Sequence, residues 1–444
     1  MKKIILLGMI VAFSCRLYGQ EDEPLTFEKA VEIGLENNFD VKIATNQVLL
    51  AENEKKQAVS LLMPVLDLNN TRVYRKEDTE QAFVSDPENP RIIPNAQTRN
   101  NNYSLVAIYG FRADAVVAMQ RLGKLREVSE LEAKVVIENT VAAIATAYYR
   151  LVLEQQRYEV LKHTLKLSDE RLEIAKAQYE FGRASKRDFL AAQVDYNADL
   201  TALVSQEQVI QNSSVNLNEL LAIGPNKNFV VNDTITIEDS YSLEELKESA
   251  LDQNKGFLAT QRMENVAYLQ LKELRAQRLP TITLNGSYID NTLNSDAGFL
   301  LSNQQQGINL GATISLNLFS GLALNKRIQA AKIQINNQKH LMEQYENQML
   351  SDLQRTFNTY QNSRRLLEIE KLNYEVAVES SDITLDRFRL GITNYLEFRD
   401  AQVSRLQAES RLIESLYTIK ENEIELMRLS GNIYFANLQE NLHE

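Results

Sequence analysis

Apolar and polar residues alternate strictly in one segment of the second half of the chain. From 308 to 318 every even position is apolar and every odd position is polar or glycine. A period of two predicts a strand with one face toward an apolar environment and the other toward water. Three further segments alternate less regularly, and we predict four strands of about 9–11 residues, at 65–74, 103–111, 281–290 and 308–318.

Strands of this length suit a tilted crossing of a bilayer. We predict that Leu310, Ile314 and Leu316 face lipid, with Thr313 and Ser315 on the water-filled side. Four strands cannot close a barrel and lipid cannot satisfy an open edge, so several chains would have to pool their strands. The alternative is a soluble four-stranded sheet packed on helices.

Long stretches without proline follow each predicted strand pair. The ranges 113–180 and 322–389 predict helices of about 100 Å. In the first range large residues recur every seven positions, which is typical of antiparallel coiled coils, at Leu151, Tyr158, Leu165, Leu172 and Tyr179. Shorter helices are predicted at 185–222 and 394–429.

A glycine separates each long helix from the shorter one. Gly182 and Gly391 favour the left-handed conformation that ends a helix. Three residues beyond each glycine stands a capping residue, with an acid at the spacing of a capping box: Ser185 with Asp188, and Asn394 with Glu397. Two tight helical hairpins are therefore predicted. Thr26 and Ser242 are the expected N-caps of two further short helices.

The two halves of the chain repeat each other. Leu35–Asn38 matches Leu251–Asn254, Pro64 matches Pro280, and Gly182 matches Gly391. The first half has seven more residues, which we assign to the polar stretch 76–100. The predicted organisation is a first repeat, a connector forming a small side domain at mid-height, a second repeat and a tail, over residues 20–224, 225–240, 241–430 and 431–444.

Composition excludes several classes of function. Glycine (15) and proline (7) are scarce, which favours long helices, and a net charge of -12 argues against nucleic acid as a partner. Cys15 is the one cysteine and the three histidines are scattered, so no metal site is expected. No phosphate loop, zinc-protease motif or nucleophile elbow is present. We predict no catalytic residue and no cofactor.

The first nineteen residues have the pattern of a secretory signal peptide. Lys2 and Lys3 precede the apolar stretch 4–13, which is about half the length of a membrane-spanning helix. We predict cleavage after Gly19. The alternative is lipid attachment at Cys15, because Ala12–Cys15 loosely resembles a lipobox.

Secretion, the internal repeat, the strand pairs and the long coiled coils together resemble the TolC-like outer membrane efflux proteins, also called outer membrane factors. The resemblance covers nearly the whole chain after residue 19. Its most specific elements are the repeat, the strand end Leu318-Phe319-Ser320-Gly321, and the two glycine-containing tips. The corresponding end in the first half, Tyr109–Arg112, departs from the Phe-Ser-Gly pattern.

This resemblance implies a mainly α fold with a β-barrel portion. In a homotrimer, twelve strands would close one outer-membrane barrel, and the helices would continue it as a coiled-coil α-barrel in the periplasm. The implied function is a passive exit duct for efflux or type I secretion, fed by an inner-membrane pump through a periplasmic adaptor. The alternative is a secreted periplasmic coiled-coil scaffold or adaptor protein, lipidated through Cys15.

The resemblance also assigns functional residues. It implies an acidic periplasmic gate formed by Glu397 and Asp400, where the first tip has Asp188 and Ala191. The alternative role is capping for Glu397 and a favourable first-turn charge for Asp400. Contact with the adaptor is expected at both tips, through Gly182, Arg183, Ser185, Asp188, Gly391, Thr393, Asn394 and Tyr395.

Overall fold

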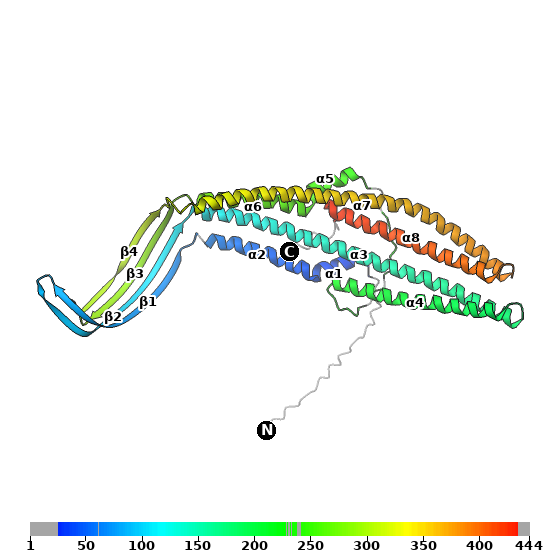
Figure 1. The fold of residues 1–444 in the computed structure, drawn as a ribbon, viewed down its shortest axis with the longest axis horizontal. Coiled ribbons are helices and arrows are strands. Elements are labelled where there is room, and N and C mark those ends of the chain that lie inside the picture. Colours follow the sequence, from blue (N-terminus) through cyan, green and yellow to red (C-terminus); the bar gives the residue numbers. More distant parts are fainter. Residues whose placement is uncertain are drawn as a thin grey trace, which may run out of the picture.

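The computed structural model describes residues 25–60, 62–227, 229, 231, 233–237 and 241–433. The predicted signal peptide, with Cys15, and the tail beyond 433 lie outside these residues. Within these residues, twelve elements form a long rod with a sheet at one end and helical hairpins at the other (Figure 1). They are α1 (Phe27–Asn37), α2 (Phe39–Ser60), β1 (Val65–Phe83), β2 (Asp86–Phe111), α3 (Ala113–Glu180), α4 (Lys186–Leu220), α5 (Leu243–Gln253), α6 (Lys255–Ala276), β3 (Thr281–Ser295), β4 (Ser302–Ser315), α7 (Ala323–Arg389) and α8 (Tyr395–Ser430).

The helices are close to those that the sequence predicts. The long helix over 113–180 is confirmed as α3, and α7 begins one residue later than predicted because Leu322 adopts a left-handed conformation with φ of 65°. Thr26 accepts a hydrogen bond from the Lys29 amide and so caps α1. Ser242 occupies the same position before α5 but makes no side-chain cap bond.

A buried asparagine organises the same corner in both repeats. Asn38 accepts hydrogen bonds at the start of α2, and its amide donates to the carbonyl of Leu220 at the end of α4. Asn254 caps α6 in the same way and donates to the carbonyl of Leu429 near the end of α8. Each asparagine therefore joins the start of one helix to the end of another across the repeat.

The four strands form one antiparallel sheet in the order β1-β2-β3-β4. They are 14 to 26 residues long, so the predicted length of 9–11 residues was wrong. The stretch 76–100 is not a loop: most of it extends the β1–β2 hairpin, because backbone pairing continues through polar residues. At the other end β4 stops at Ser315, so Leu316 and Leu318 lie beyond the strand.

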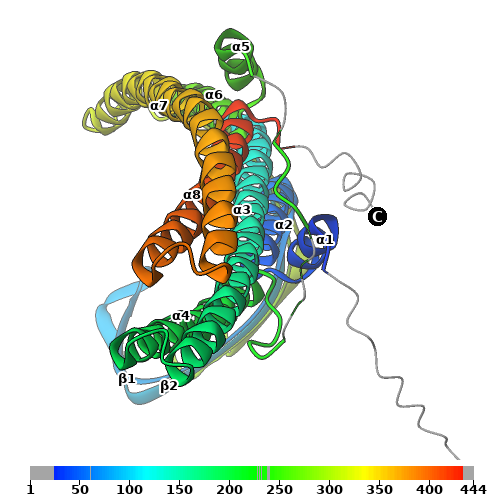
Figure 2. The same cartoon turned by 90° about the vertical axis from the view of Figure 1, so that its right-hand side faces the viewer.

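The helices form a curved layer (Figure 2). Beside the sheet the order across the layer is α2, α3, α6, α7, and toward the tips it is α4, α3, α8, α7. The short helices α1 and α5 pack against this layer at mid-height. Among the described residues, no further helix lies beside either lateral edge, which α2 and α4 form on one side and α7 on the other.

The main core lies at mid-height around α3. Tyr148 is fully buried there, and its hydroxyl donates to the Leu25 carbonyl and contacts the Asp233 carboxylate. Val231 and Ile235 are buried in the same core. The described part of the connector is therefore packed against the helices at mid-height, and Val231 and Ile235 share a core with helix residues.

Candidate functional site

The sheet has one apolar and one polar face. Residues that pair in register point to the same face. One row across the four strands is Leu68, Leu105, Tyr288 and Ile308, whereas the row Thr71, Asn102, Asn291 and Gln305 is polar throughout. Because a membrane barrel places apolar residues toward lipid and polar residues toward its lumen, this arrangement fits such a barrel.

Two of the three residues predicted to face lipid lie on the apolar face. Leu310 and Ile314 are 83% and 72% exposed. The third, Leu316, is exposed but follows the end of β4, because pairing with β3 ceases at Ser315. Their contact with lipid stays a proposal.

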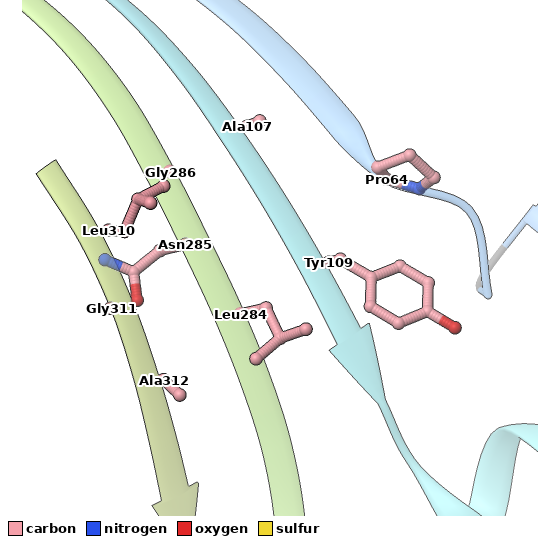
Figure 3. A pocket seen from close by; sticks show the side chains of 9 residues that line it. All are labelled: Pro64, Ala107, Tyr109, Leu284, Asn285, Gly286, Leu310, Gly311 and Ala312. Atoms are coloured by element: carbon pink, nitrogen blue, oxygen red, sulfur yellow. The ribbon is translucent and has the colours of Figure 1, made fainter. Parts of the chain in front are cut away.

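Small residues hollow the apolar face near its helical end (Figure 3). Leu284, Leu310 and Tyr109 surround a depression of about 510 Å³. A Cβ at Gly286 would lie 3.3 Å from the Leu310 side chain, so glycine allows that leucine to lie close to β3. Its lining is mostly apolar, with Asn285 as the polar exception.

Both helical tips have the predicted backbone. Gly182 and Gly391 each have φ of 71°, which strongly favours glycine. Ser185 and Asp188 form a complete capping box, and Asn394 accepts a hydrogen bond from the Glu397 amide. Each tip is also closed by a stacked aromatic pair, Tyr179 with Phe189 and Phe388 with Phe398.

The two acids predicted to form a gate lie exposed on the first turns of α8. The Glu397 carboxylate accepts from the Thr393 hydroxyl and from the Asn394 amide at 3.2 Å, so this residue takes part in capping. Asp400 makes no hydrogen bond or ion pair with any described residue. Its carboxylate is thus free to face a pore, and the gate stays a proposal.

A groove of about 580 Å³ runs between the two tips. Arg183, Asp188, Gly391, Thr393, Asn394 and Tyr395 line it together with residues of α3 and α7. Arg389 of α7 reaches across to Glu170 of α3 at 2.7 Å and ties the hairpins at this level. The structure therefore brings most of the predicted tip residues together along one surface.

A polar cluster is buried among α3, α4 and α8, next to the groove and farther from the tips. Fully buried Arg171 of α3 lies 3.2 Å from the Asp195 carboxylate of α4 and 3.2 Å from the Gln402 amide oxygen of α8. Arg399 of α8 pairs with Asp199 of α4 at 2.9 Å. A buried ion-pair network of this kind joins the two hairpins specifically.

Tyr395 belongs to this cluster rather than to the exposed tip surface alone. Its hydroxyl donates to the Asp195 carboxylate, and its ring lies 5.0 Å from the Arg171 guanidinium. Burial, followed by the hydrogen bond to Asp195, raises the pKa of Tyr395 above its usual value. The phenol therefore stays protonated and remains a donor at physiological pH.

The sequence did not predict this cluster, because its members do not follow the apolar heptad. The predicted seam residues Tyr158, Leu165 and Leu172 are only half-buried, whereas polar Ser168 and Arg171 are fully buried. One signal was present in the spacing: Asp195 and Asp199 are four residues apart, and Arg399 and Gln402 are three apart, so each pair shares a helix face.

No helix among the described residues is long and apolar enough to cross a membrane. In the same part of the chain, no group of three or more histidine, cysteine or acidic residues could hold a metal ion.

Sequence comparison identifies relatives among outer membrane proteins. Residues 246–432 match the family described as "Outer membrane efflux protein". Outer membrane protein TolC of Vibrio cholerae is 23% identical over 311 residues, which cover 67% of this chain and 68% of that protein. The probable efflux pump outer membrane protein TtgC of Pseudomonas putida is 23% identical over 303 residues, or 66% of this chain and 61% of its own length.

Solved structures share the fold over almost the whole chain. The outer membrane protein VceC of Vibrio cholerae superposes with a TM-score of 0.75 at 17% identity, covering 91% of this chain and 96% of that one. The outer-membrane channel OprN gives 0.74 at 17% identity, covering 91% and 90%. The Campylobacter jejuni CmeC outer membrane channel gives 0.74 at 14% identity, covering 91% and 85%.

Proposed function

We propose that this chain is the exit duct of a tripartite efflux or type I secretion system, because residues 246–432 match the outer membrane efflux family and the chain shares its fold with outer membrane channels. The family consists of outer membrane channels rather than enzymes. In this role the protein conducts substrates passively. An inner-membrane pump delivers them through a periplasmic adaptor, and the duct extends from the periplasm across the outer membrane.

The open edges of the chain support assembly into a homotrimer. The sheet ends in β1 and β4, and the helical layer ends in α2 with α4 and in α7. Each edge carries exposed apolar residues, among them Phe39, Ile43, Leu50, Val194 and Val204 on one side and Ile333, Leu341, Ile369, Val376 and Ile383 on the other. In a ring, the edge formed by α2 and α4 of one chain would pack against the α7 edge of the next chain and bury the apolar residues of both. Three chains joined in this way would also close a barrel of twelve strands.

The observation that carries the proposal is the two-faced sheet on a long helical layer. A periplasmic scaffold or adaptor, the alternative, has no need of an exposed apolar sheet face, and such a face would promote aggregation in water. A barrel uses both faces, one against lipid and one along the conduction path.

Conductance of the purified protein tests the proposal. We expect chemical crosslinking in mild detergent to give a trimer, and insertion into planar lipid bilayers to give uniform conductance steps. A protein that stays soluble without detergent and forms no conducting unit would favour the scaffold. Co-purification of a periplasmic adaptor and an inner-membrane pump with the tagged chain tests the tripartite arrangement.

A further inference from the structure

Two arginines lie on the apolar face of the sheet near its outer end, which is the end farther from the helices. Residues of the apolar face continue outward on β1 as Asn70, Arg72 and Tyr74. Arg72 pairs in register with Asn101, and Tyr74 pairs with Arg99, so both arginines lie on this face one row apart. If the apolar face contacts lipid, these basic residues lie at the depth where the acyl chains of the lipid end and its headgroups begin.

Polar and aromatic side chains hold both arginines. Arg72 donates to the Asn101 oxygen at 3.3 Å and to the Tyr103 hydroxyl at 3.0 Å. The Arg99 guanidinium lies 5.7 Å from the centre of the Tyr74 ring. No carboxylate of a described residue lies within 4.0 Å of either guanidinium. Their positive charges are therefore oriented but not neutralised.

Acids close to these arginines are engaged elsewhere. Asp290 pairs in register with Tyr103 and accepts from Gln306 at 3.1 Å. Asp78 accepts from the backbone amide of Asn95 at 2.7 Å. Lys76, two positions beyond Tyr74, adds a third positive charge on the same face.

A hollow of about 640 Å³ lies between the two arginines and the neighbouring strands. Neutral hydrogen-bonding groups of β2 and β3 also line it, and Val73 and Tyr74 of β1 make up the rest; the polar residues are Asn100, Asn101, Thr292 and Asn294. Arginine binds phosphate through paired N–H groups, and a hollow between two arginines can accept one phosphate from both.

We propose that Arg72 and Arg99 bind the phosphate of a phosphorylated glycolipid in the outer leaflet of the outer membrane. The acyl chains of that lipid then lie on the apolar rows below, which begin with Leu68 and Leu105. Each basic residue near a membrane surface strengthens the binding of anionic lipid about fivefold, and two give about 25-fold. The inference depends on the proposed orientation of the apolar face toward lipid.

Native mass spectrometry of the detergent-purified full chain tests this site. The probes are diphosphorylated lipid A, chemically dephosphorylated lipid A and inorganic phosphate. We expect the natural chain to retain the phosphorylated lipid about 25-fold better than the dephosphorylated form, and R72Q/R99Q to lose that preference. R72K/R99K keeps both charges and should keep most of the preference. R75Q is the matched control on the same strand, because Arg75 lies on the polar face beside Glu77.

Equal retention of the two lipids by the natural chain would overturn the proposal, as would an unchanged preference in R72Q/R99Q. Retention of inorganic phosphate without any preference between the lipids would identify an ion site and also overturn it. Conductance separates this failure from failure of the proposed function: a natural chain that conducts without lipid preference refutes only the lipid site, whereas a chain that never inserts refutes the channel.

Discussion

The Arg399 guanidinium on α8 lies 2.9 Å from the Asp199 carboxylate on α4, and this ion pair joins two hairpins that belong to different repeats. Both side chains are mostly buried, so replacing Arg399 by alanine leaves the acid without its partner. We expect a loss of about 1–3 kcal/mol in the free energy of unfolding. Weaker attachment of α8 to α4 should also increase single-channel conductance.

R411A is the control for this prediction. Arg411 pairs with Glu370 at 3.0 Å, but the pair lies between α8 and α7 of one hairpin. Conductance should be unchanged in R411A. If R399A and R411A conduct alike, the buried pair stabilises the fold without restraining the pore.

The proposed gate predicts an effect of Glu397 and Asp400 on ions. In a trimer these two positions would supply six carboxylates, so multivalent cations should block the natural channel. E397A/D400A should lose that block. Because Glu397 also takes part in capping, stability should fall by about 0.5–2 kcal/mol, mostly from E397A. Block that persists in the double variant, with only stability reduced, would move the gate elsewhere.

The two faces of β4 predict opposite tolerance of charge. Leu310 lies on the apolar face, opposite Gly286, whereas Asn309 lies on the polar face, opposite Ser287. A charge at the lipid-facing middle of a barrel costs about 2–4 kcal/mol. L310R should therefore greatly reduce the yield of assembled, heat-resistant trimer, and N309R should not. Equal yields from the two neighbouring substitutions would refute the assignment of faces.

Gly391 predicts a role for the second tip in docking. Its φ of 71° disfavours residues other than glycine, although a Cβ there would meet no other atom within 4 Å. G391V should distort the tip and weaken binding of the adaptor, measured by co-purification, while the trimer still forms. G391N is the control, since asparagine tolerates this conformation. Normal adaptor binding by a folded G391V trimer would argue against docking here.

Glu138 predicts a pH dependence of stability. Burial raises the pKa of this carboxyl to about 7, against the opposing influence of Lys255, Arg428 and Lys134. The folded state therefore holds the proton more tightly than the unfolded state, where the pKa is about 4.5. This contribution to stability is complete below about pH 4.5 and is lost as pH rises toward 7.

The measurement is the thermal midpoint at pH 5 and pH 8. E138Q should reduce the fall in midpoint between these pH values, because the neutral amide resembles the protonated carboxyl. E132Q, at an exposed position on the same helix, should leave the fall unchanged. The same pH response in E138Q and the natural chain would exclude Glu138 as its source.

The sequence by itself determined the parts of this protein that depend on local chemistry and on repetition. Glycine conformation and capping predicted both tips, and the absence of proline predicted the long helices, because these features act between residues near in the chain. Strict alternation located β4 and its apolar face. The matching asparagines at 38 and 254 revealed the repeat, although not their bonds to Leu220 and Leu429.

Tertiary structure decided what depends on residues far apart in the chain. Strand length was misjudged because the β1–β2 hairpin is extended by backbone pairing, to which polar side chains are no obstacle. The cluster around Arg171 was missed because ion pairs between three helices carry no apolar periodicity. The structure alone shows that Val231 and Ile235 of the connector lie in the main core with Tyr148, because alternation records which residues are buried but not which core buries them.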